Sequence, residues 1–185
     1  MNDKINILGF AGSLRKESFN RALLRNAARF IPDNSSLEFF ELDGIPPFNQ
    51  DTEKDMHEKV RKFKSKIREA DAILISTPEY NYSVPGVLKN AIDSASRPYG
   101  DNPFDGKPVA IMSASIGMLG GARAQYHLRQ IFVFLNMYPI NRPEVMVNFA
   151  ADKFDSNGNL SDETSQKLIG ELIQNLVNWA ILLQK

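Results

Sequence analysis

The chain of 185 residues contains no cysteine. Disulfide bonds, thiolate nucleophiles and cysteine-ligated metal sites are therefore excluded together. Its two histidines, His57 and His127, lie far apart and lack the short spacing of a metal-binding helix, so we expect no metal site. Chemistry that depends on a thiol or on a metal has little support in this sequence.

The chain also lacks an excess of charge of either sign. Twenty-two Lys and Arg residues balance 22 Asp and Glu residues, so we expect no non-specific binding to nucleic acid or to an anionic membrane. The charged residues of the helix expected at 53–69 are interpreted as a solvated face rather than a nucleic-acid patch.

Long apolar runs and a leader segment are missing as well. No run is long enough to span a bilayer, and the first residues show no basic stretch followed by an apolar one. We therefore expect a cytoplasmic protein without a membrane partner. The length and the 43% hydrophobic fraction fit a single globular domain covering residues 1–185.

Two common nucleotide-binding motifs are absent. A P-loop needs a Gly-Lys pair followed by Ser or Thr, which the chain does not contain. A dinucleotide fingerprint needs G-x-G-x-x-G, and Gly9 and Gly12 have the wrong spacing with no third glycine after them. Residues 9–20 instead form a loop rich in glycine and hydroxyl groups. It lies between an apolar stretch at 5–8 and apolar residues at helical spacing.

A strand, a loop and a helix in this order point the N-terminus of the helix at the space above the strand. Its unpaired N–H groups and positive dipole end suit an anion, most commonly a phosphate. Ser13, Ser18 and Asn20 add polar groups, and Arg15 adds a charge. In the alternative interpretation, Ser18 only caps the helix and Arg15 is a solvated surface charge.

Strand and helix patterns alternate along the whole chain. We expect strands at residues 5–8, 37–42, 72–77, 109–113 and 144–147. We expect Ser83 to cap the helix after the third strand and Ser161 to cap the last helix. Alternation predicts a doubly wound, five-stranded parallel sheet in the flavodoxin-like order 2-1-3-4-5, with helices on both faces and a ligand beyond the carboxyl ends of the strands.

Three loops with unusual composition follow the first, third and fourth of these strands. The first loop suits a phosphate; residues 78–83 offer Tyr80 and Tyr82 for stacking on a planar ring. Residues 113–121 are small enough for the backbone to approach such a ring closely. A phosphate at one end and a polar-edged aromatic ring at the other describe flavin mononucleotide, FMN. Alternatively, the two tyrosines only cover the core.

These loops resemble the motifs of a known family. Residues 12–20 resemble the G-S-x-R-x-x-S-x-N phosphate loop of the NAD(P)H-dependent FMN reductases. Residues 78–93 resemble the family's second signature, P-E-Y-N-x-S-x-P-x-x-L-K-N-A-I-D, and residues 120–125 are similar to a segment of its quinone- and chromate-reducing branch. The resemblance covers essentially the whole chain and implies a flavodoxin-like flavoenzyme that binds FMN without a covalent bond.

The resemblance also implies the residues that bind FMN. It places Ser13, Arg15, Ser18, Phe19 and Asn20 around the phosphate, Pro78, Glu79, Tyr80, Asn81 and Ser83 beside the ribityl chain and the ring, and Ser115 and Gly117 at the remaining side.

The implied activity needs no catalytic side chain, because the flavin carries the chemistry. We expect an enzyme that takes hydride from NADPH or NADH and reduces quinones, azo compounds, nitroaromatics or chromate by a ping-pong mechanism. Glu79 could be a general acid, but positioning of the ring or electrostatics at a helix end is the favoured interpretation. For His127 a structural hydrogen bond is favoured over catalysis. The alternative function is a flavodoxin-type electron carrier; such carriers are usually acidic, whereas this chain is neutral.

The helix expected at 122–136 is unusual because residues 131–135 are apolar on every side. A surface helix normally shows one apolar stripe. We therefore expect a homodimer or homotetramer that uses this helix, together with residues 87–94. Arg123, Tyr126 and Glu144 either form a polar network between subunits or are surface groups near the edge of the sheet.

Overall fold

The computed structural model describes residues 4–184, and its strands form one parallel sheet. The strands are β1 (Ile5–Ala11), β2 (Ser35–Phe40), β3 (Ala72–Ser76), β4 (Pro108–Ala114), β5 (Tyr138–Pro139) and β6 (Val145–Val147). Their order is β2-β1-β3-β4-β5, and β6 also pairs with β4. The predicted flavodoxin-like order is confirmed.

The position beyond β4 is shared by two short segments. β5 pairs with the first residues of β4, Pro108 and Val109, whereas β6 pairs with its last three. The sequence predicted β6 alone, because a two-residue strand that ends in Pro139 has no alternating pattern to recognise.

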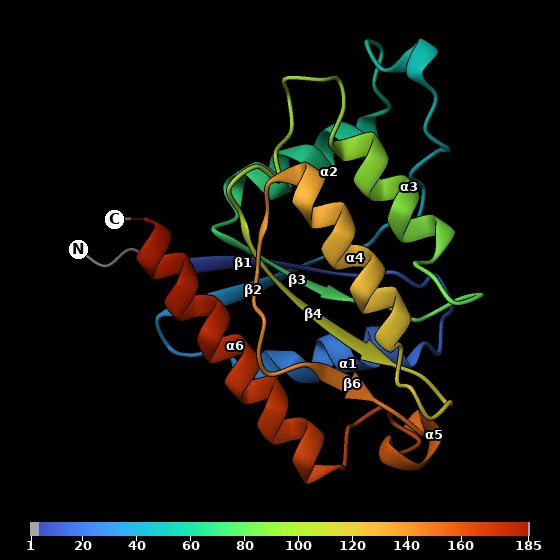
Figure 1. Ribbon diagram of the computed structural model, residues 1–185, viewed down its shortest axis with the longest axis vertical. Coiled ribbons are helices and arrows are strands. Elements are labelled where there is room, and N and C mark those ends of the chain that lie inside the picture. Colours follow the sequence, from blue (N-terminus) through green and yellow to red (C-terminus); the bar gives the residue numbers. More distant parts are fainter. Residues whose placement is uncertain (1–3, 185) are drawn as a thin grey trace.

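Helices cover both faces of this sheet, as predicted (Figure 1). They are α1 (Phe19–Ala27), α2 (Glu58–Glu69), α3 (Gly86–Ala95), α4 (Ala122–Leu135), α5 (Ala150–Lys153) and α6 (Glu163–Leu183). Alternate residues of β1 belong to opposite cores: Ile5 and Ile7 pack with α1 and α6, and Leu8 and Phe10 pack with α2, α3 and α4. β3 and β4 are buried along their whole length, which explains their continuous apolar runs. No helix among residues 4–184 has the length and apolar character needed to cross a membrane.

Of the three serines interpreted as helix caps, Ser18 is confirmed and the other two are not. Ser18 caps α1, since its hydroxyl accepts the N–H groups of Asn20 and Arg21. The prediction for Ser83 is wrong, because α3 begins three residues later, after Pro85, with no side-chain cap. The prediction for Ser161 is wrong by one residue: Asp162 caps α6.

Asp162 makes the stability of α6 depend on pH. Hydrogen bonds from Ser165, its side chain first and its backbone N–H next, lower the pKa of Asp162, and Lys153 adds to the effect. A lowered pKa stabilises the fold above the pKa of the unfolded state, about 4, and this stabilisation is lost as the pH falls through the folded value. We expect Asp162→Ala to lower the free energy of unfolding by about 1 kcal/mol at neutral pH and by less in acid. Urea unfolding at several pH values measures the difference, with Ser161→Ala as the control. An Asp162→Ala effect that does not change with pH contradicts this account.

Candidate functional site

Three loops meet at the carboxyl ends of β1, β3 and β4, on the right of Figure 1. A hollow of about 210 Å³ lies between them. Its lining consists of Ser13, Arg15, Ser18, Phe19, Asn20, Pro78, Glu79, Tyr80, Ala114, Ser115 and Ile116. All five residues predicted in the first loop therefore come together with Pro78, Glu79, Tyr80 and Ser115. Asn81, Ser83 and Gly117 lie outside this lining.

The first loop is folded onto the N-terminus of α1. The N–H of Arg15 donates to the Ser13 hydroxyl at 3.4 Å, and its guanidinium donates from Nε to the carbonyl of Glu17 at 3.1 Å. The guanidinium also lies 5.7 Å from the centre of the Phe19 ring. Ser18 both caps α1 and lines the hollow, so its two interpretations are compatible. Hydroxyl groups, a positive charge and the positive end of a helix face one space, which suits a phosphate.

Asn20 connects the first loop to the other two strands of the site. The residue is 3% exposed, and its Nδ2 donates to the carbonyl of Ala114 at 2.8 Å. Its Oδ1 accepts from the Ala114 N–H at 2.9 Å and from the Ser76 hydroxyl at 3.3 Å. The side chain thus holds the start of α1 against the ends of β3 and β4.

The second loop turns tightly and exposes its aromatic residues. The backbones of Tyr80 and Ser83 pair in both directions, at 3.1 and 3.0 Å, and Asn81 and Tyr82 between them have positive φ angles of 49° and 67°. Tyr80 is 51% exposed and Tyr82 is 70% exposed. The interpretation that these tyrosines cover the core is therefore wrong. Tyr80 lines the hollow with its ring exposed, whereas one face of the Tyr82 ring is covered by the Arg123 guanidinium.

Glu79 joins this loop to the start of α4. Its Oε2 accepts the N–H groups of Arg123, at 2.9 Å, and Ala124, at 3.3 Å, and its Oε1 lies 2.6 Å from Arg123 Nε. The preceding Gly121 offers no side chain as a cap, so Glu79 supplies one from 44 residues away. A carboxylate at a helix N-terminus is electrostatically favourable. This geometry supports the helix-end role of Glu79.

The residues of the predicted polar network, Arg123, Tyr126 and Glu144, contact side chains of the same chain. The Arg123 guanidinium lies 3.5 Å from the centre of the Tyr82 ring, and the Tyr126 hydroxyl lies 3.4 Å from Glu144 Oε2. His127 forms the expected hydrogen bond: its Nδ1 lies 2.9 Å from the Ser83 hydroxyl.

The third loop is fixed by a buried residue that the sequence analysis missed. Gln125 is fully buried, and its Nε2 donates to the Ser113 hydroxyl at 2.7 Å and to the Val145 carbonyl at 2.8 Å. Ser113 in turn donates to the carbonyl of Gly120 at 2.6 Å. The sequence contains one signal that could have identified Gln125. It lies three residues before the buried Leu128, and this helical spacing places its polar side chain on the inward face of α4.

Gly120 cannot carry a side chain without displacing the backbone of β6. Its φ is +58°, and a Cβ atom would lie 2.8 Å from the carbonyl C and O atoms of Met146. We expect Gly120→Ala to lower the free energy of unfolding by about 2–4 kcal/mol, from the left-handed backbone and the clash together. Gly100→Ala is a matched control, since φ is +85° there but nothing lies within 4 Å. Chemical denaturation compares the two variants, and equal losses contradict the clash.

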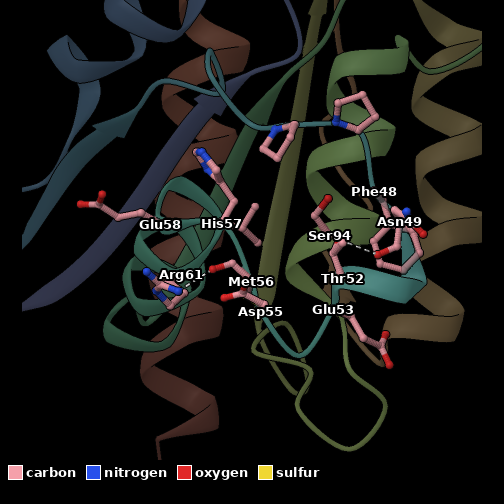
Figure 2. A pocket seen from close by; sticks show the side chains of 13 residues that line it. Phe48, Asn49, Thr52, Glu53, Asp55, Met56, His57, Glu58, Arg61 and Ser94 are labelled. Atoms are coloured by element: carbon pink, nitrogen blue, oxygen red, sulfur yellow. Dashed lines mark hydrogen bonds between the residues drawn. The ribbon is translucent and has the colours of Figure 1, made fainter.

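A larger hollow, of about 430 Å³, lies elsewhere, between the segment 46–57, the start of α2 and Ser94 of α3 (Figure 2). None of the predicted site residues lines it. Figure 2 shows Glu53 and Glu58 pointing away from it on opposite sides. The smaller hollow has the features of a cofactor site, because strand ends, a helix N-terminus and the exposed ring of Tyr80 meet there. Those groups fit both the phosphate and the ring of FMN.

Comparisons with known proteins identify the family of the chain. The family model described as NADPH-dependent FMN reductase matches residues 5–152. The NAD(P)H-dependent FMN reductase of Pseudomonas aeruginosa is 49% identical over 180 residues, which cover 97% of either chain. A quinone reductase of Escherichia coli is 42% identical over 93% of this chain and 94% of its own.

A solved structure leads to the same result. The flavoenzyme NAD(P)H:(acceptor) oxidoreductase FerB of Paracoccus denitrificans superposes with a TM-score of 0.87 at 33% identity, covering 95% of this chain and 97% of its own. The residues, the fold and these matches agree, and the chain belongs to the family of NADPH-dependent FMN reductases, as an enzyme that uses FMN and NAD(P)H.

Proposed function

We propose that this enzyme reduces quinones with hydride taken from NADH or NADPH, through FMN bound in the hollow between the three loops. The observation that carries the proposal is that phosphate-binding groups and an aromatic ring line the same hollow. Arg15 and the Ser13 and Ser18 hydroxyls lie at the N-terminus of α1, and Tyr80 lies exposed beside them. FMN supplies hydride chemistry when bound, and the protein supplies binding and orientation. A relative with 42% identity is named quinone reductase.

Each predicted residue has a role in this proposal. Ser13, Arg15, Ser18 and Phe19 surround the phosphate, and Asn20 positions their loop through Ala114. The ribityl chain and the ring would be held by Pro78, Glu79, Tyr80, Asn81, Ser83, Ser115 and Gly117. Recognition of a planar acceptor is then mostly stacking on a flat ring, so azo compounds and nitroaromatics are accepted besides quinones. Chromate is tetrahedral and cannot stack, and it is accepted as a small anion that reaches the same open site.

Kinetics test this function directly. Donor and acceptor stack on one face of the same ring, so they bind in turn, and double-reciprocal plots for NADPH against a quinone series should be parallel. Intersecting lines contradict the ping-pong order. The alternative is a flavodoxin-type electron carrier, which oxidises free nicotinamide at a negligible rate. Negligible oxidation of both NADH and NADPH with every quinone contradicts the enzyme and favours the carrier.

Arg15 is the residue to test for cofactor binding. We expect Arg15→Ala to weaken FMN binding by about 10- to 100-fold, because a charged hydrogen bond contributes about 1–3 kcal/mol. Quenching of FMN fluorescence on titration of the apoprotein measures the affinity. Arg29→Ala removes an exposed arginine from the far end of the same helical segment, and its affinity should not change. An apoprotein that binds FAD tightly and FMN poorly contradicts the proposed cofactor site.

The proposal extends to assembly and location. Val133 and Phe134 on α4 are 82% and 72% exposed, and we propose that a second copy of the chain covers them in a dimer or tetramer. Because nicotinamide nucleotides are intracellular donors, the proposed site of action is the cytoplasm.

A further inference from the structure

We propose that His127 and Ser83 form a proton relay to the electron acceptor. The relay rests on the proposed function, since it serves the reduction of a quinone by NAD(P)H. The relay gives two side chains an acid–base role in an enzyme whose electrons are transferred by its cofactor.

The stoichiometry of the reaction requires a proton source. The overall reaction is NAD(P)H + H⁺ + quinone → NAD(P)⁺ + hydroquinone. The nicotinamide supplies two electrons and one hydrogen nucleus as hydride, so the second proton of the hydroquinone comes from water. A side chain that exchanges protons near neutral pH can carry that proton, and histidine is the residue whose ordinary pKa suits the task.

The hydrogen bond between the two side chains lies beside the cofactor hollow. Ser83 Oγ and His127 Nδ1 are 2.9 Å apart. The Ser83 backbone is paired in both directions with Tyr80, which lines the hollow. His127 is exposed, so its imidazole ring can exchange protons with the solvent. Ser83 itself lies outside the lining, so the pair extends from the turn that borders the hollow to bulk water.

The elements that carry the pair are joined rigidly. Glu79, four residues before Ser83, accepts the N–H groups of Arg123 and Ala124 at the start of α4, one turn before His127. The turn between Tyr80 and Ser83 is closed by two backbone hydrogen bonds. The relay geometry is therefore fixed by hydrogen bonds within the chain, which is what general acid catalysis requires.

The ionisable groups that line the hollow are poorly suited to this task. The Glu79 carboxylate is held by two N–H groups and by the Arg123 guanidinium. The remaining two are Arg15 and Tyr80; guanidinium groups in general keep their protons at neutral pH, and phenols in general release theirs only in alkaline solution.

Other charged or titratable groups occupy the elements that meet at His127. α4 contributes Arg123 and Tyr126, and the second loop contributes Glu79, Tyr80 and Tyr82. On α3, Lys89 and Asp93 pair with each other at 2.6 Å.

The proton moves through two bonds. Protonated His127 donates from Nδ1 to Ser83 Oγ; that N–H bond breaks as a new O–H bond forms on Ser83. The original O–H bond of Ser83 breaks as its proton reaches the quinone oxygen. Neutral His127 keeps its proton on Nε2 and takes a new one from water at Nδ1, so one proton enters and one is consumed in each turnover.

A comparison of two acceptors tests the relay. Ferricyanide accepts electrons without protons, so the ratio of quinone turnover to ferricyanide turnover isolates proton delivery. His127→Asn places an amide where Nδ1 was, which can still bond to Ser83 but cannot titrate. We expect this ratio to fall by about 10- to 100-fold in His127→Asn and in Ser83→Ala.

A matched histidine variant controls the comparison. His57 caps α2 by accepting the N–H of Lys59, and asparagine is an equally good cap. His57→Asn should therefore leave the ratio unchanged. If the ratio of quinone turnover to ferricyanide turnover is the same in His127→Asn as in the wild type, the relay is wrong, whatever the absolute rates. A wild-type protein that oxidises NAD(P)H with neither acceptor overturns the proposed function, and the relay with it.

Nuclear magnetic resonance provides a measurement that does not depend on activity. The chain has only two histidines, so the His57→Asn spectrum assigns the His127 ring directly. The titration midpoint of that ring should match the midpoint of the pH profile for quinone turnover in the wild-type protein. Ser83→Ala should move the ring midpoint. A pH profile for quinone turnover whose midpoint differs from that of the His127 ring contradicts the relay.

Discussion

Replacing Asn20 by alanine should lower the free energy of unfolding by about 2–4 kcal/mol and release FMN as well. The variant leaves the N–H and the carbonyl of Ala114 and the hydroxyl of Ser76 without their buried partner. An unpaired buried polar group costs about 1–3 kcal/mol. The same contacts set the distance between the first loop and the end of β4, so the phosphate loop loses its position together with stability.

A second buried asparagine on α1 separates these two effects. Asn26 is 6% exposed; its side chain donates to the carbonyls of Ala22 and Gly158 and accepts from the Leu160 N–H, away from the hollow. Asn26→Ala should destabilise the fold by a similar amount while FMN affinity, measured on the folded protein well below its unfolding temperature, stays near the wild-type value. Urea denaturation and FMN titration of both variants measure the two quantities. Equal losses of FMN affinity show that Asn20 acts through stability alone.

The sheet could be predicted because its signals are local. The strands β3 and β4 are buried along their length, so their residues form continuous apolar runs that stand out between polar helices. Right-handed crossovers then leave few possible strand orders. The three loops could be located for the same reason, since each follows directly on a recognisable strand.

The contacts that shape the site could not be predicted, because they join residues far apart in sequence. Asn20 looks like a phosphate ligand in its motif, but its partner Ala114 lies 94 residues away. Glu79 caps a helix 44 residues later, and Ser83 is paired with Tyr80 in a turn rather than with the start of α3. Nothing local distinguishes such a side chain from one that reaches a ligand.

The same limit applies to the apolar end of α4. The sequence shows five apolar residues in a row, but only the structure tells which of them need a second layer. Phe132 and Leu135 are buried in the core against the sheet, whereas Val133 and Phe134 point outward. A charge at Phe132 would therefore unfold the protein, while a charge at Phe134 tests association.

The Phe134→Glu variant should convert an assembled protein to monomers. Tyr126, Val133 and Phe134 are all exposed, and their spacing of seven and eight residues places them on one face of α4. Burying a large apolar side chain contributes about 1.5–3 kcal/mol, and a two-fold interface buries each side chain twice. Loss of Phe134 from both copies, with two like charges brought together, should raise the dissociation constant by about a thousandfold or more.

Sedimentation over a range of concentrations measures this change. Leu182→Glu is the matched control, because Leu182 is an exposed apolar residue, 53% accessible, on α6 at the opposite face of the sheet. Its substitution introduces the same charge and should leave both association and the unfolding midpoint unchanged, because the side chain is exposed. The Phe134→Glu variant should have a lower midpoint that no longer rises with protein concentration, because association stabilises only the folded state. A wild-type protein that sediments as a monomer at micromolar concentration contradicts the proposed assembly. A Phe134→Glu protein that remains assembled shows that the copies meet through another surface.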